Sequence, residues 1–190
     1  MEVGRTGGEG AMKMNKMKEH AAKYVTINAL SIALVCISTM VIQIPIPLGY
    51  MHLGNTCILL TAAMFGPGTG LLAGGIGSAM ADLLTGYTQW VLPTLLIKSV
   101  MGLVIGLLAW GSEKKLHMAS PRTLLAGVAG VAVMVFGYTA AGAVLNGSFY
   151  TGLLQVPGLT LEGVIGLAAF YALGFVLEKA HVIRLLGRIG

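Results

Sequence analysis

Charged side chains are scarce in this chain of 190 residues. Lys, Arg, Asp and Glu make up 10% of the sequence, whereas hydrophobic residues make up 56% and the mean hydropathy is +0.84. A soluble domain carries about 25% charged residues, so this composition excludes an ordinary soluble fold. Long apolar runs predict membrane-spanning helices of roughly 20 residues each. The 28 glycines suit helices that pack closely in lipid.

Motifs for chemistry are also lacking. The only cysteines, Cys36 and Cys57, lie in apolar runs, which favours two free buried thiols over a disulfide. The sequence has no G-x-x-x-x-G-K-[ST] loop for a nucleotide phosphate and no His/Cys cluster for a metal. We therefore expect no catalytic residue, no metal and no cofactor, and we expect that the chain is not an enzyme.

The basic residues are distributed in a way that predicts topology. They gather before the first apolar run, between the fourth and fifth runs, and after the last. Six spans place these three regions on one side, and the opposite loops contain no Lys or Arg. The positive-inside rule then places both termini in the cytoplasm. The net charge of +5 is thus a topology signal rather than a sign of nucleic-acid binding.

The predicted fold is therefore an all-α integral membrane protein with six transmembrane helices. Residues 1–20 are expected to form a basic tail that is disordered or not native, residues 21–182 a single membrane domain, and residues 183–190 a cytoplasmic basic tail. The spans are expected at 24–43, 54–65, 69–86, 90–110, 124–146 and 160–180.

Two proline-containing segments interrupt the helices. Pro45 and Pro47 exclude a helix over residues 44–53, which predicts a loop or short extended segment. This segment also carries Tyr50 and His52, and it is a candidate lid. The Gly-Pro-Gly sequence at 66–68 predicts a tight turn between the second and third spans.

Asp82 and Lys98 are charges inside apolar runs. Gly70, Gly74 and Ser78 share a helical face with Asp82, and glycines follow Lys98 at the same spacing of four residues. Each small-residue groove thus carries a charge at one end. Leaving either charge unpaired in hydrocarbon costs about 3 kcal/mol. Three interpretations stay open: an ion pair that locks the third and fourth spans, a polar cavity that the charges line, and a Lys98 side chain that reaches the interface.

Polar and aromatic residues collect at the outer ends of the predicted spans. An aromatic-walled pocket with a few directional polar groups suits a small planar ligand. Tyr87 and Trp90 also fit the aromatic belt of a membrane interface. The candidate substrate-binding residues are Asn55, Asp82, Tyr87, Gln89, Trp90, Lys98, Asn146 and Glu162.

Ala29 and Ala33 form an Ala-x-x-x-Ala strip on the first span. Such a strip permits close approach of another helix, either within this chain or in a separate subunit.

The Pro-rich first outer loop, the short second span and the stretch HLGN…FGPGTGLLAGGIGSAMADLLTGY…LIKSVMGLVIG together resemble the substrate-binding (S) components of energy-coupling factor (ECF) vitamin transporters. The similarity is to the riboflavin-type group, including members assigned to pyridoxine or hydroxymethylpyrimidine. It implies high-affinity binding of a B-vitamin or precursor at the outer face, under a lid formed by residues 44–53. It also implies a multi-pass protein of the bacterial plasma membrane.

The resemblance further implies partners. S components dock on a membrane coupling subunit of the EcfT type, which works with two cytoplasmic ATPases, and the family's coupling strip matches Ala29 and Ala33. Pyridoxine or hydroxymethylpyrimidine is the expected substrate, because few charges and several single amides suit a small neutral ring. The alternative is a stand-alone secondary transporter or channel that uses Asp82 as an ion or proton site. The absence of convincing internal repeats argues against that alternative.

Overall fold

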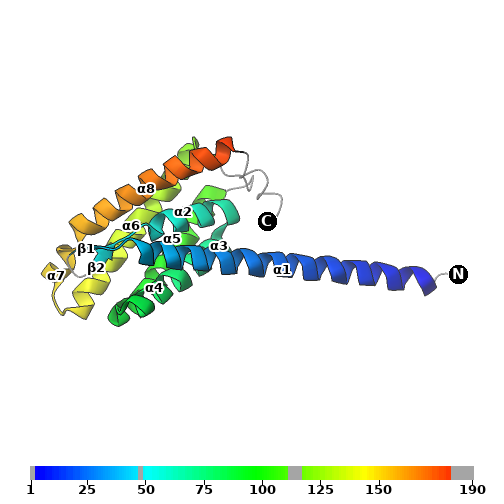
Figure 1. The fold of residues 1–190 in the computed structure, drawn as a ribbon, viewed down its shortest axis with the longest axis horizontal. Helices are drawn as coiled ribbons and strands as arrows, with labels where there is room; N and C mark the ends of the chain where they lie inside the picture. The colour runs from blue at the N-terminus through cyan, green and yellow to red at the C-terminus, as the bar shows by residue number, and fades with distance from the viewer. Residues whose placement is uncertain (1–2, 47–48, 111–116, 181–190) are drawn as a thin grey trace.

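The computed structural model describes residues 3–46, 49–110 and 117–180, which form packed helices and one short β-hairpin (Figure 1). In chain order the elements are α1 (Val3–Val41), β1 (Ile44–Ile46), β2 (Gly49–Met51), α2 (Gly54–Phe65), α3 (Pro67–Leu72), the π-helical turn η1 (Ala73–Gly77), α4 (Ser78–Thr85), the 3-10 turn η2 (Thr88–Trp90), α5 (Val91–Trp110), α6 (Pro121–Leu145), α7 (Phe149–Leu153) and α8 (Val156–Lys179).

The predicted spans agree with helical stretches, most closely for α2, which has the expected bounds. Within the described residues, four stretches are long and apolar enough to cross a membrane: Met12–Val41, Thr88–Trp110, Pro121–Leu145 and Phe149–Lys179. Helix α2 has only 12 residues, and the third predicted span is built from α3, η1 and α4 in direct succession. The total of six spans and the side of the termini stay predictions.

Helix α1 begins at Val3 and so includes residues 3–20 of the predicted tail. Figure 1 shows the N-terminal part of α1 extending well beyond the other helices. The division of the chain into tails and a membrane domain stays a prediction.

Apolar and polar side chains are arranged as in a membrane protein. Large hydrophobic side chains such as Leu30, Leu96 and Val144 are exposed, whereas Lys98 is 1% exposed and Asp82 5%. Water would favour the opposite arrangement, but hydrocarbon tolerates exposed leucine and excludes exposed charge. The inside of the helix assembly is therefore where the polar chemistry lies.

Helix α5 lies at the centre of the packing and contacts α2, α3, α4 and α6, while α8 packs on α2 and α6. Helix α1 covers the other side of α2, η1 and α4. The hairpin and α7 lie together at one end of the molecule, opposite the start of α1 (Figure 1).

The glycine grooves predicted on the third and fourth spans do face each other. A Cβ atom added at Gly102 would collide with the backbone of Gly70, and one at Gly106 would lie 2.8 Å from the carbonyl carbon of Gly66. The close contact continues along α5 at the π-helical turn, where Gly75 approaches the carbonyl of Leu95. Close backbone approach therefore positions Lys98, one turn before Gly102, at a fixed place beside the third predicted span.

Three local predictions are also confirmed. Helix α2 ends at Gly66, whose φ of +90° favours glycine, and Pro67 starts α3. Residues 44–46 and 49–51 are extended, with Pro45 paired to Tyr50 in the antiparallel hairpin. Cys36 and Cys57 are both free thiols.

Replacing Gly102 by Ala should destabilise the protein by about 1–3 kcal/mol, because backbone atoms of Gly70 cannot move aside as a side chain would. Thermal unfolding in detergent measures this effect. The control Leu96→Ala changes an exposed side chain on the same helix and should cost much less. Equal stability of Gly102→Ala and the wild type would contradict this account of the packing.

Candidate functional site

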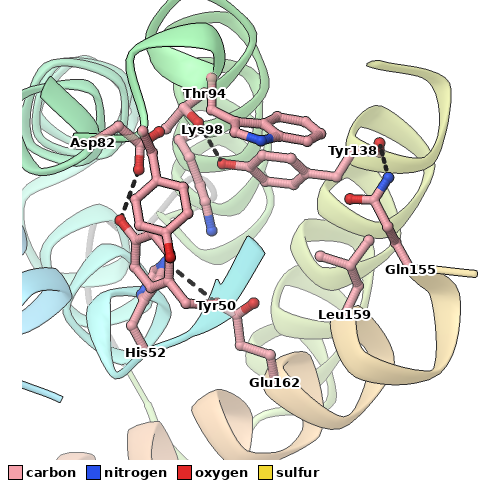
Figure 2. Close-up of a pocket in the computed structure, with 11 residues that line it drawn as sticks. Tyr50, His52, Asp82, Thr94, Lys98, Tyr138, Gln155, Leu159 and Glu162 are labelled. Atoms are coloured by element: carbon pink, nitrogen blue, oxygen red, sulfur yellow. Dashed lines mark hydrogen bonds and ion pairs between the residues drawn. The ribbon is translucent and has the colours of Figure 1, made fainter. Parts of the chain in front are cut away.

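A pocket opens at the hairpin end of the molecule, between β2, α4, α5, α6 and α8 (Figure 2). It encloses about 420 Å³ of space between atoms, including the part open to solvent. Its lining is Tyr50, His52, Asp82, Tyr87, Trp90, Thr94, Lys98, Tyr138, Gln155, Leu159 and Glu162.

The hairpin is attached to two acidic side chains of the pocket. The Tyr50 hydroxyl donates a hydrogen bond to Asp82 Oδ1 at 2.7 Å, and His52 Nε2 lies 3.5 Å from Glu162 Oε1. Asp82 belongs to α4 and Glu162 to α8. The segment predicted to be a lid therefore bridges two helices across the pocket.

His52 is held in one tautomer. The backbone N–H of Gly54 donates to His52 Nδ1 at 3.0 Å, so the ring proton lies on Nε2, which faces Glu162. Burial, and secondly the positive charge of Lys98, lower the pKa of His52 well below its ordinary value. His52 is thus a neutral donor to Glu162 near neutral pH.

Lys98 and Glu162 are joined through an amide. The Lys98 ammonium donates to Asn55 Oδ1, and Asn55 Nδ2 donates to Glu162 Oε1 at 2.7 Å. Both donors also approach the sulfur of Met134, at 3.3 Å from Lys98 and 3.0 Å from Asn55. Asn55 is fully buried. A single amide therefore connects a buried cation with a buried anion, as its two-sided hydrogen-bonding capacity allows.

Aromatic rings form the remaining wall. The rings of Tyr50 and Tyr87 lie 4.6 Å apart, and those of Trp90 and Tyr138 lie 5.7 Å apart, both pairs tilted. The Tyr138 hydroxyl donates to Thr94 Oγ1 at 2.9 Å. Lys98 Nζ lies 5.4 Å from the centre of the Tyr138 ring. The wall offers flat surfaces for stacking, with its hydroxyl groups anchored in the protein.

The predicted alternative of an Asp82–Lys98 ion pair is wrong. Within the described residues Asp82 bonds to Tyr50, and Lys98 bonds to Asn55. Asp82 and Lys98, at the ends of the two grooves, do line the same pocket, but each forms its hydrogen bond with a residue that is distant in sequence. Lys98 does not reach the interface either, since it is 1% exposed. Asp82 and Lys98 both line the pocket, which agrees with the predicted alternative of a polar cavity.

Six of the eight candidate residues belong to this site: five line the pocket and Asn55 connects two of them. Gln89 and Asn146 do not, because both are exposed, and the Asn146 side chain donates to the Gly142 carbonyl of its own helix. Of the lid residues, Tyr50 and His52 line the pocket, Pro45 is exposed, and Pro47 lies outside the described residues. The ligand contacts of all these residues stay predictions.

Sequence reasoning missed Thr94, Tyr138 and Leu159 as lining residues, whereas Gln155 is one of the polar residues at the outer ends of the predicted spans. Thr94 had a signal, since Trp90, Thr94 and Lys98 repeat at four residues and share a helical face. Tyr138 and Leu159 come from different helices, and their proximity depends on the packing of α6 and α8. In the described part of the chain, no group of three His, Cys, Asp or Glu side chains is placed to hold a metal.

Comparison with known proteins supports one family. A family model described as "ECF-type riboflavin transporter, S component" matches residues 19–179. A protein of Pyrococcus woesei named "Uncharacterized protein in gap 3'region" is 39% identical over 153 residues, which cover 76% of this chain and 99% of the relative. The match and the apolar helices together indicate a multi-pass membrane protein.

We predict energetic coupling between Lys98 and Glu162. Lys98→Met or Glu162→Gln alone leaves a buried charge without its counterpart and should cost about 3–5 kcal/mol of stability. The double variant should recover about 1–3 kcal/mol of the summed loss, measured by unfolding in detergent. The control cycle, Lys98→Met with Asp82→Asn, should show a smaller coupling. A larger coupling in the control would mean that Asp82 is the true partner of Lys98.

We predict that Tyr50 slows ligand release. Tyr50→Phe removes a hydrogen bond to a charged acceptor, worth about 1.5–3 kcal/mol, so the ligand should dissociate roughly tenfold faster or more. Stopped-flow or filter-binding kinetics measure this rate. Tyr150→Phe, on an exposed ring at the same end, is the matched control. An unchanged rate in Tyr50→Phe would remove the hairpin from the release step.

Proposed function

Since the chain belongs to the family of ECF-type riboflavin transporter S components, we propose that it binds pyridoxine or hydroxymethylpyrimidine and delivers it by docking on an EcfT-type coupling subunit with two ATPases. Membership itself makes the chain the substrate-binding component of a vitamin transporter and not an enzyme. The proposal adds the substrate, the partners and a location in the bacterial plasma membrane.

The observation that carries the choice of substrate is the pocket lining. Tyr87, Trp90 and Tyr138 provide flat walls, and Asp82, Lys98 and Glu162 provide directional polar groups between them. A single heteroaromatic ring with hydroxyl or amino substituents uses both features.

The docking surface rests on the strip on α1. Ala29 and Ala33 are both exposed, and the neighbouring side chains Leu30 and Ile37 are exposed and apolar. None of these side chains is needed to cover the pocket. The strip is therefore available for a helix of a coupling subunit, and small residues allow that helix to approach closely.

The substrate is tested directly by mass spectrometry of small molecules that co-purify with the protein, followed by titration of the purified protein with each B-vitamin and precursor. Pyridoxine or hydroxymethylpyrimidine should co-purify and should raise the unfolding temperature. Co-purification of riboflavin or of an acidic vitamin would overturn the choice of substrate. Absence of binding by every compound would instead favour a structural or assembly role.

The partners are tested by separating binding from uptake. Ala29→Leu or Ala33→Leu should leave ligand affinity unchanged, because the strip is remote from the pocket, and should abolish uptake by vesicles that contain the coupling subunit and ATPases. Ala168→Leu, at an exposed position on α8, is the matched control and should transport normally. Uptake driven by an ion gradient without any partner would support the alternative in which Asp82 serves a secondary transporter.

A further inference from the structure

The charges around the pocket do not balance. Asp82 and Glu162 contribute two carboxylates, whereas Lys98 contributes one ammonium group and His52 is neutral. All three charged side chains are at least 95% buried. With both acids ionised, the binding site would carry one more negative than positive charge, and these groups are buried rather than on a solvated surface.

The single cation is committed to Glu162. Asn55 accepts from the Lys98 ammonium and donates to Glu162, so the cation and this carboxylate share one buried bridge. His52 adds a second neutral donor to the same carboxylate. Of the two acids in the pocket, Glu162 is therefore the one whose charge is compensated by Lys98.

Asp82 is the unbalanced acid. It accepts a hydrogen bond from the neutral hydroxyl of Tyr50, and within the described residues no ion pair joins it to Lys98. A buried carboxylate without a counter-charge is costly, and a bound ligand with a positive or strongly donating group would relieve that cost. Tyr87, Trp90 and Thr94 line the same pocket and are uncharged, and Lys98 acts on Asp82 through space rather than by an ion pair.

The aromatic walls favour the same kind of ligand. Tyrosine and tryptophan rings attract a cation through their negative faces. Tyr50 and Tyr138 border the pocket (Figure 2), and its lining also includes Tyr87 and Trp90. An anionic ligand would meet the opposite conditions, since it would add a third negative group beside these rings. Lys98 also borders the pocket, but it directs one of its three N–H donors to Asn55 and through that amide is linked to Glu162.

We propose that Asp82 selects the ligand by charge: the site takes a nitrogen heteroaromatic ring whose protonated ring nitrogen or amino group pairs with Asp82, and it rejects vitamins that carry a carboxylate. This inference rests on the proposed function and narrows it. It assigns to Asp82 the role of specificity-determining residue, with Tyr50 as the lid residue that closes over the pair.

The ligand side of the test uses two compounds with the same ring. Pyridoxine and 4-pyridoxate differ at one substituent, which is hydroxymethyl in the first and carboxylate in the second. Isothermal titration of the wild-type protein should show at least tenfold tighter binding of pyridoxine. Equal affinities, or tighter binding of 4-pyridoxate, would overturn the inference while leaving the S-component assignment intact.

The protein side uses Asp82→Asn, which removes the charge but keeps an oxygen that accepts from Tyr50. The ratio of the two affinities should fall about tenfold in this variant, and an unchanged ratio would overturn the role of Asp82. Glu178→Gln is the matched control, because it removes a carboxylate from the far end of α8 and should keep the wild-type ratio. Thermal unfolding checks that both variants are folded; if Asp82→Asn is not, the wild-type ratio decides alone.

If neither compound binds, hydroxymethylpyrimidine and its analogue without the 4-amino group provide the second matched pair, and the amino compound should bind at least tenfold more tightly. Failure of both pairs would overturn the substrate choice of the proposed function together with this inference. Binding of both pairs without preference would overturn the inference alone.

Discussion

The hydrogen-bonded bridge from Lys98 through Asn55 to Glu162 is the interaction on which the site depends. It joins α5, α2 and α8, three helices that are distant in sequence, at one buried point. In hydrocarbon a separated cation and anion would each be costly, so the bridge constrains how these helices pack. The same bridge links one acid of the pocket to the buried cation, and in the proposed role the other acid, Asp82, would act on the ligand.

Glycine packing makes this bridge possible. The backbones of α5 and the α3–η1–α4 stretch approach closely at Gly70, Gly102 and Gly106. Lys98, on α5, then lies within reach of Asn55 on α2. The same close approach also places Thr94 and Trp90, one and two turns earlier, along the same wall. A larger residue in these grooves would move the wall relative to the hairpin, so structural and binding requirements are linked in this region.

The hairpin and the residue that follows it add an extended element to an otherwise helical site. Tyr50 and His52 contact one acid each, on α4 and α8, so the position of this segment is linked to both carboxylates. In the proposed lid role, a ligand that pairs with Asp82 would compete with the hydrogen bond from Tyr50.

The sequence by itself determined the membrane class, the positions of the helices, the break at residues 44–53 and the glycine contact, because each depends on local composition or on helical periodicity. It also identified Asp82, Lys98, Asn55 and Glu162 as unusual, since polar groups in apolar runs need partners. Only the tertiary structure decided which side chains form hydrogen bonds with these polar groups. The nearest charge in sequence was the expected partner of Lys98, but helix packing brought Asn55 and Glu162 closer, and it turned Gln89 and Asn146 outward. Side-chain pairing across distant helices depends on depth and rotation, which periodicity alone does not specify.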